Sequence, residues 1–181
     1  MKKALSMIVI ASASFGFMTA SHAASAESKA SYDAAKKSAD ADYKAAREKC
    51  DTLKDNAKDV CQAEAKAARV KTTAEAEAAY KGTDKAHQEA RKDIADANYE
   101  VAKEKCDDLK GNEKDVCQKE AKAAKESAIA DAKAAKNVSE ARHDAAADKR
   151  DANTAVQKEK CDALSGEEKS RCIGAANNMK R

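Results

Sequence analysis

The chain has 181 residues, with 35 Lys or Arg against 32 Asp or Glu, no Pro and no Trp. Aromatic residues make up only 3% of it, and alanine supplies most of the 43% hydrophobic fraction. Because burying Ala removes little apolar surface, at about 25 cal/mol per Å², this composition excludes a thick globular core. The dense but balanced charge argues against a nucleic-acid-binding face and against a polybasic membrane patch.

Residues 1–23 have the layout of a signal peptide. Lys2 and Lys3 form a basic start, residues 4–20 form an apolar segment, and Ser21-His22-Ala23 is a small-x-small cleavage site. We expect cleavage after Ala23, which removes Lys2 and Lys3 and leaves 33 basic against 32 acidic residues. An uncleaved anchor is the alternative, but about 17 residues rich in Ser and Ala are short for a membrane span. The prediction is a periplasmic protein without stable membrane insertion, in an oxidising compartment.

The remainder, residues 24–181, is expected to be one repetitive helical region. Its segments are rich in Ala, Lys, Glu, Arg and Gln, which are good helix formers. Acid-first pairs such as Asp33–Lys37 and Asp40–Lys44 stand at i,i+4 spacing and support helix by a few tenths of a kcal/mol each. Disorder is the alternative, since low hydrophobicity with high charge also marks chains that do not collapse. The absence of Pro favours helix.

Three Cys boxes divide this region, near residues 43–69, 99–125 and 156–180. YKAAREKCDTLKDNAKDVCQAEAKAAR matches YEVAKEKCDDLKGNEKDVCQKEAKAAK, and VQKEKCDALSGEEKSRCIGAANNMK is a weaker third copy. Within each box the second Cys follows the first by eleven residues, and the boxes recur about every 56 residues. The pairs are Cys50 with Cys61, Cys106 with Cys117, and Cys161 with Cys172.

Each box predicts a reversal of the chain between two helices. In the second box Gly111 fits the left-handed position just past a helix end, and Asn112 fits the N-cap of the next helix. Asp55-Asn56 takes this role in the first box, and Ser165-Gly166 takes it in the third, where Glu167 and Glu168 favour the positive end of the new helix. The predicted turn residues are therefore Asn56, Gly111, Asn112 and Gly166.

Counted outward from each turn, the two cysteines lie level on opposing helices, so each pair is placed for a disulfide that staples the tip of a helical hairpin. Closing such a loop stabilises it by about 3 kcal/mol in the chain-entropy model. The predicted fold is all-α: elongated antiparallel hairpins or a coiled-coil-like bundle with three stapled tips. The linking helices either run for about 50 residues each or break near Gly82-Thr83 and near Asn137-Ser139.

The chain shows little sign of catalytic or cofactor chemistry. Short Cys-x₂₋₄-Cys spacing is missing, and His87 and His143 lie about twenty residues from any Cys, so no metal site is expected. The two histidines fall in register in two repeats, and a paired pH-sensitive or metal site remains an alternative to simple solvation. Thin helices offer no cleft that would shift the pKa of an acid–base pair, so neither an enzyme nor a cofactor is expected.

The KCDxLxGNxKDVCxxEAKA box, at residues 105–123, resembles that of small exported proteobacterial proteins that are often labelled as TolA-like cell-envelope proteins. The Ala/Lys/Glu-rich helical character is also similar to the periplasm-spanning middle region of TolA. Lys54-Asp55 in the first box, and Ser165-Gly166 with Arg171 in the third, depart from the box pattern. The resemblance implies an association with the cell envelope.

Three functions follow as hypotheses. The first is a non-enzymatic periplasmic structural or interaction protein, with envelope or periplasmic proteins, or a second copy in a homo-oligomer, as partners. The second is a stress-protective or chaperone-like hydrophilic helical protein. The third is a thiol or metal sensor that uses the Cys pairs or His87 and His143.

Overall fold

The structure is a computed structural model that describes residues 28–179, which form five α-helices and no strand. The predicted signal peptide lies outside the described residues. The helices are α1 (Lys29–Cys50), α2 (Asp55–Lys81), α3 (Asp84–Cys106), α4 (Gly111–Cys161) and α5 (Gly166–Asn178). The all-α prediction with three disulfide-stapled hairpin tips is confirmed.

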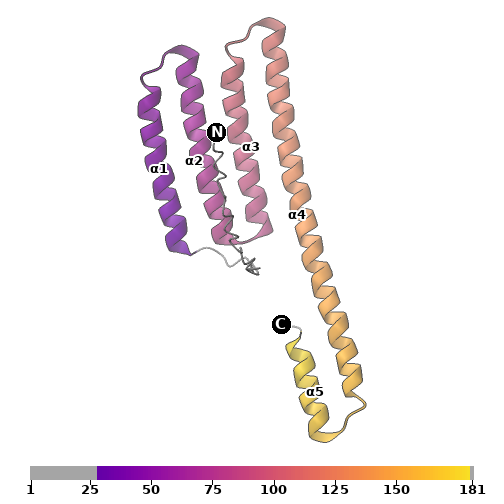
Figure 1. Cartoon of the computed structure of the whole chain (residues 1–181). Coiled ribbons are helices and arrows are strands. Elements are labelled where there is room, and N and C mark those ends of the chain that lie inside the picture. The colour runs from indigo at the N-terminus through magenta and orange to yellow at the C-terminus, as the bar shows by residue number, and fades with distance from the viewer. Residues whose placement is uncertain (1–27, 180–181) are drawn as a thin grey trace, which may run out of the picture.

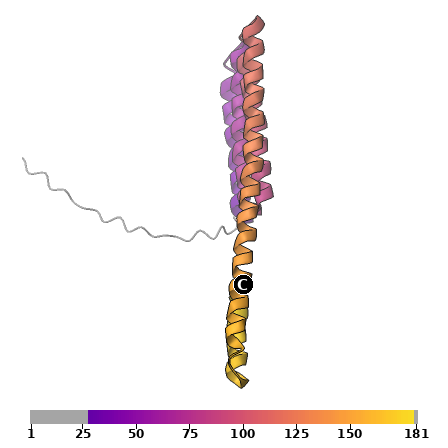
Figure 2. The same cartoon turned by 90° about the vertical axis from the view of Figure 1, so that its right-hand side faces the viewer.

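Helices α1 to α3 and the first half of α4 lie side by side in one flat layer, while the second half of α4 runs on beyond it (Figure 1). Figure 2 shows the layer edge-on, one helix thick. Within the described residues each helix packs only against its neighbours in sequence, α1 on α2, α2 on α3, α3 on α4 and α4 on α5. Both broad faces of the layer are therefore left without a second layer of helices.

Alanine forms the seams between these helices. The cluster between α2 and α3 consists of Ala74, Ala78, Ala86 and Ala90, with Ile94 packed against it. Small side chains let the helices approach closely, but they bury little apolar area. Ring contacts supplement the seams: Tyr32 of α1 stacks on Tyr80 of α2 with ring centroids 5.2 Å apart.

The chain reverses at Gly82 but not at the equivalent place one repeat later. Gly82 caps α2 in the left-handed conformation, with φ 59°, and the Thr83 side chain accepts a hydrogen bond from the backbone N–H of Ala86 at 3.1 Å to start α3. Fifty-six residues on stands Val138, inside α4. The predicted break near Gly82-Thr83 is thus present, and the one near Asn137-Ser139 is absent, because a β-branched residue resists positive φ.

Uninterrupted, α4 is 51 residues long, or about 75 Å at 1.5 Å per residue. It carries the third Cys box away from the first two, whose tips lie together at the opposite end of the molecule (Figure 1). The 13-residue helix α5 folds back along the end of α4 and contacts no other helix of the described chain.

The turn residues differ in part from their predicted roles. Gly111 and Gly166 have the expected positive φ, 53° and 55°, but each begins its helix, since the preceding helix has already ended at its cysteine. The N-cap prediction for Asn112 is wrong, because Lys110 occupies the cap of α4. The helix ends four residues earlier than the Gly signal indicated, and Asp107 to Lys110 make the turn. Asp55 takes the left-handed position in the first box, with φ 50°.

Candidate functional site

The three disulfides have nearly the same geometry. The Cα atoms of Cys50 and Cys61 lie 5.6 Å apart, and those of the other two pairs lie 5.7 and 5.6 Å apart. The first cysteine of each pair, Cys50, Cys106 or Cys161, is fully buried. All six cysteines are thus paired as predicted from their spacing, and none is a free thiol.

An ion pair bridges each tip beside its disulfide. Lys58 Nζ lies 3.0 Å from Asp51 Oδ1, and the two later boxes repeat this contact at 2.8 Å, between Lys114 and Asp107 and between Lys169 and Asp162. The hydrogen bond and charge of Lys58 lower the pKa of Asp51 below its ordinary value of 3.8. These ion pairs were not predicted from the sequence, although their residues recur at the repeat period.

A second repeated contact joins neighbouring helices at mid-length. Arg69 Nε of α2 lies 2.6 Å from Asp40 Oδ1 of α1, and its guanidinium lies over the ring of Tyr43. The next repeat has the same arrangement, with Lys125 of α4 3.1 Å from Asp96 and over the ring of Tyr99. Asp40 therefore pairs across helices, not with Lys44 as expected, and Asp33 pairs with Lys29 instead of Lys37.

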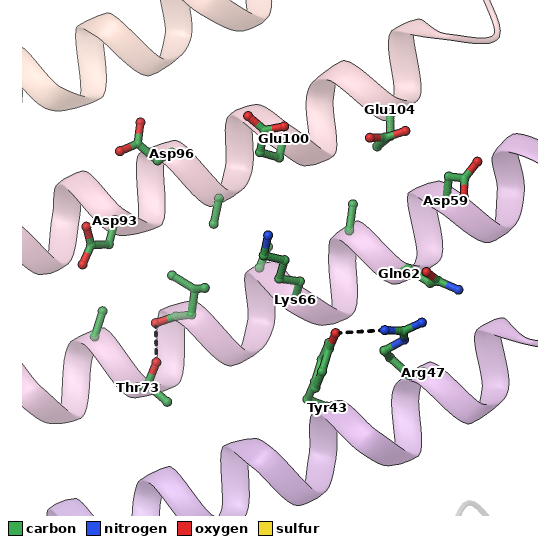
Figure 3. A pocket seen from close by; sticks show the side chains of 15 residues that line it. Tyr43, Arg47, Asp59, Gln62, Lys66, Thr73, Asp93, Asp96, Glu100 and Glu104 are labelled. Atoms are coloured by element: carbon green, nitrogen blue, oxygen red, sulfur yellow. Dashed lines mark hydrogen bonds between the residues drawn. The ribbon is translucent and has the colours of Figure 1, made fainter.

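An open groove of about 920 Å³ lies on one broad face of the layer, over α2 and between α1 and α3. Five carboxylates and two basic side chains lie along it. Figure 3 shows Asp93, Asp96, Glu100 and Glu104 spaced along α3, with Lys66 of α2 projecting between the two helices. On the α1 side, Arg47 donates a hydrogen bond to the Tyr43 hydroxyl at 3.4 Å, which raises the pKa of Arg47.

The groove is also lined by small residues of α2, Ala63, Ala67 and Ala74. The groove is open, and one of its carboxylates, Asp96, is already paired with Lys125 of α4. An acidic, elongated and shallow groove suits the reversible docking of an extended, positively charged segment. Sequence reasoning missed this row of acids, although the spacing of 93, 96, 100 and 104 places them on one helix face.

The two histidines come near one carboxylate but do not form a metal centre. His143 Nε2 of α4 lies 3.8 Å from Asp84 Oδ2 of α3, and His87 lines the same shallow pocket as Asp84. Within residues 28–179 no three His, Cys, Asp or Glu side chains are grouped to hold an ion. The His143 side chain is 77% exposed, so it is solvated.

Across the described part of the chain, no helix combines the length and apolarity needed to cross a bilayer. No family model, curated protein or solved structure matches the sequence.

Proposed function

We propose that this chain is an exported, non-enzymatic helical protein of the bacterial periplasm that acts as a structural or interaction element of the cell envelope. The observation that carries the proposal is the single layer of helices, stapled at its two tips by the first two disulfides, whose broad faces no other helix of the described residues covers. A layer one helix thick buries little core and leaves most of its side chains exposed on two broad faces, where a partner can bind. The resemblance of the Cys box to that of TolA-like exported proteins supports the same location.

The proposed location has two parts that can be tested together. Three disulfides are typical of proteins that fold outside the reducing cytoplasm, and the small-x-small site predicts cleavage after Ala23. The mature protein in a periplasmic extract should begin at Ala24 and should contain no reactive thiol. Recovery of an intact N-terminus with reduced cysteines, in the cytoplasmic fraction, contradicts the proposal.

The interaction role is tested by photo-crosslinking in the periplasm. A photo-reactive amino acid replaces Lys66, inside the groove, and in a matched variant replaces Lys71, which lies about 140° round α2 on the other side of the layer. We expect crosslinked products from the Lys66 position that are absent or weaker at Lys71. Equal labelling at the two positions excludes the groove as the docking face, and no product at either position speaks against an interaction role.

A further inference from the structure

The contact between α2 and α3 has three components. Near the tips, Asn56 Nδ2 donates a hydrogen bond to the backbone carbonyl of Glu104 at 3.0 Å. Two turns further along α2, Lys105 Nζ of α3 lies 2.7 Å from Glu64 Oε1. The remainder of the seam is the alanine cluster with Ile94. This contact joins two successive hairpins, α1–α2 and α3–α4.

The repeat places the same residues at the two outer edges of the layer. The residues on the α2 side of the contact recur 56 positions later in the chain, on α4. The residues on the α3 side recur 56 positions earlier, on α1. The α4 edge carries Asn112, Glu120, Ala130 and Ala134, which correspond to Asn56, Glu64, Ala74 and Ala78. The α1 edge carries Glu48, Lys49, Ala30 and Ala34, which correspond to Glu104, Lys105, Ala86 and Ala90. Among the residues of this contact named above, only Ile94 has a different counterpart, which is Ser38 on α1.

Nothing in the described chain covers these two edges. All eight corresponding residues, and Ser38, are exposed, whereas the four alanines of the α2–α3 seam are buried. Val116 is 44% exposed on α4, while its counterpart on α2, Val60, is partly covered. On α4 the buried residue Ala132, which faces α3, is about 200° from Ala130, so the Ala130 line points away from the layer.

We propose that a second copy of this chain docks its α1 edge against the α4 edge of the first, along residues 111–134, and thereby repeats the α2–α3 contact between molecules. The charges are complementary, because Glu120 of one copy meets Lys49 of the next. Helices α1 and α4 run antiparallel in Figure 1, as α2 and α3 do, so the added copy keeps the orientation of the first. Such a heterologous contact joins two different edges. A pair of copies therefore still has a free α1 edge at one end and a free α4 edge at the other, so further copies can add and form a row.

This inference deepens the proposed function, since it names one partner of the layer, but it can be tested on the purified chain alone. Sedimentation velocity on the oxidised protein from a periplasm should show mass that rises with concentration beyond the monomer. Ala34→Arg on the α1 edge and Ala130→Arg on the α4 edge should each weaken association at least about tenfold, because a charged side chain then enters the close seam. Ala124→Arg, on an exposed site about 120° round α4 from Ala130, is the matched control and should associate like the parent.

Mixing provides the second measurement. Lys49→Glu and Glu120→Lys each place like charges across the contact and should associate less than the parent, whereas an equal mixture of the two restores opposite charges and should recover association. Monomers at every concentration up to about 0.5 mM overturn the inference. Equal loss in the Ala124→Arg control, or a mixture no better than its components, also overturns it. Crosslinking at the groove, tested separately, is unaffected by these outcomes.

Discussion

Gly82 and Val138 stand 56 residues apart at equivalent points of the repeat, and the chain folds back at the first but runs straight through the second. Gly82 has φ 59°, a conformation that costs a residue with a Cβ about 1–2 kcal/mol and a β-branched residue more. This difference sends two Cys boxes to one end of the molecule and the third to the other (Figure 1).

Replacing Gly82 with Val should therefore destabilise the reversal between α2 and α3. We expect the free energy of unfolding to fall by about 2 kcal/mol, because the left-handed cap becomes strained. Urea unfolding followed by circular dichroism measures it. Val138→Ala, at an exposed site inside α4, is the control and should change stability by less than about 0.5 kcal/mol. A Gly82→Val protein as stable as the parent would show that the turn is not held by this backbone conformation.

The third staple should hold α5 almost alone. This helix has 13 residues and packs only on α4, and isolated helices shorter than about 12–15 residues are marginal in water. In the double variant Cys161→Ser with Cys172→Ser, we expect the amides of α5 to lose hydrogen-exchange protection while α1 to α3 keep theirs. The matched variant Cys50→Ser with Cys61→Ser should lower global stability by about 3 kcal/mol but leave α2 protected by its seam with α3. Persistent protection of α5 without its disulfide contradicts this account.

The mid-length contacts around Arg69 and Lys125 should have similar strengths, since they repeat one arrangement. Each combines an ion pair that is at least partly exposed with a cation on a tyrosine ring, so Arg69→Ala or Lys125→Ala should lower the free energy of unfolding by about 0.5–1.5 kcal/mol. Lys71→Ala on the same helix as Arg69 serves as the control. In a double-mutant cycle, Arg69→Ala should couple with Tyr43→Ala but not with Tyr99→Ala. Additive effects for the Arg69 and Tyr43 pair would exclude the ring contact.

The Asp51–Lys58 contact should make a small part of the stability depend on pH. The hydrogen bond and charge of Lys58 lower the pKa of Asp51 in the folded chain below 3.8. The stabilisation by this contact is therefore fully present above the unfolded pKa and is lost as pH falls through the folded pKa. Asp51→Asn should therefore destabilise the protein at neutral pH and have little effect in strong acid. Thermal melts at several pH values measure the difference between the two proteins. A difference that does not narrow towards acid would rule out this linkage.

Part of the architecture could be predicted from the sequence. The helices were predicted from the helix-forming composition. The stapled tips were predicted from the eleven-residue spacing of Cys50 and Cys61 and its recurrence in the later boxes, and the disulfide partners are confirmed. The turn chemistry was less well predicted. Gly111 adopts the expected left-handed conformation but at the start of α4, and Asn112 is not its cap. A Gly signal marks the conformation but does not say which of two nearby helix ends it serves.

The sequence by itself determined the local features of this protein: the helices, whose stability depends on residues three and four apart, and the tips, which are closed by covalent bonds across eleven residues. Only the tertiary structure decided how the hairpins lie together. It places Glu104 beside Asn56, 48 residues away, assembles the acidic groove from three helices, and leaves the helices in one layer. The physical reason is that alanine lines several faces of these helices alike, so the sequence pattern does not single out one seam, whereas the paired charges, the rings and one glycine do so in three dimensions.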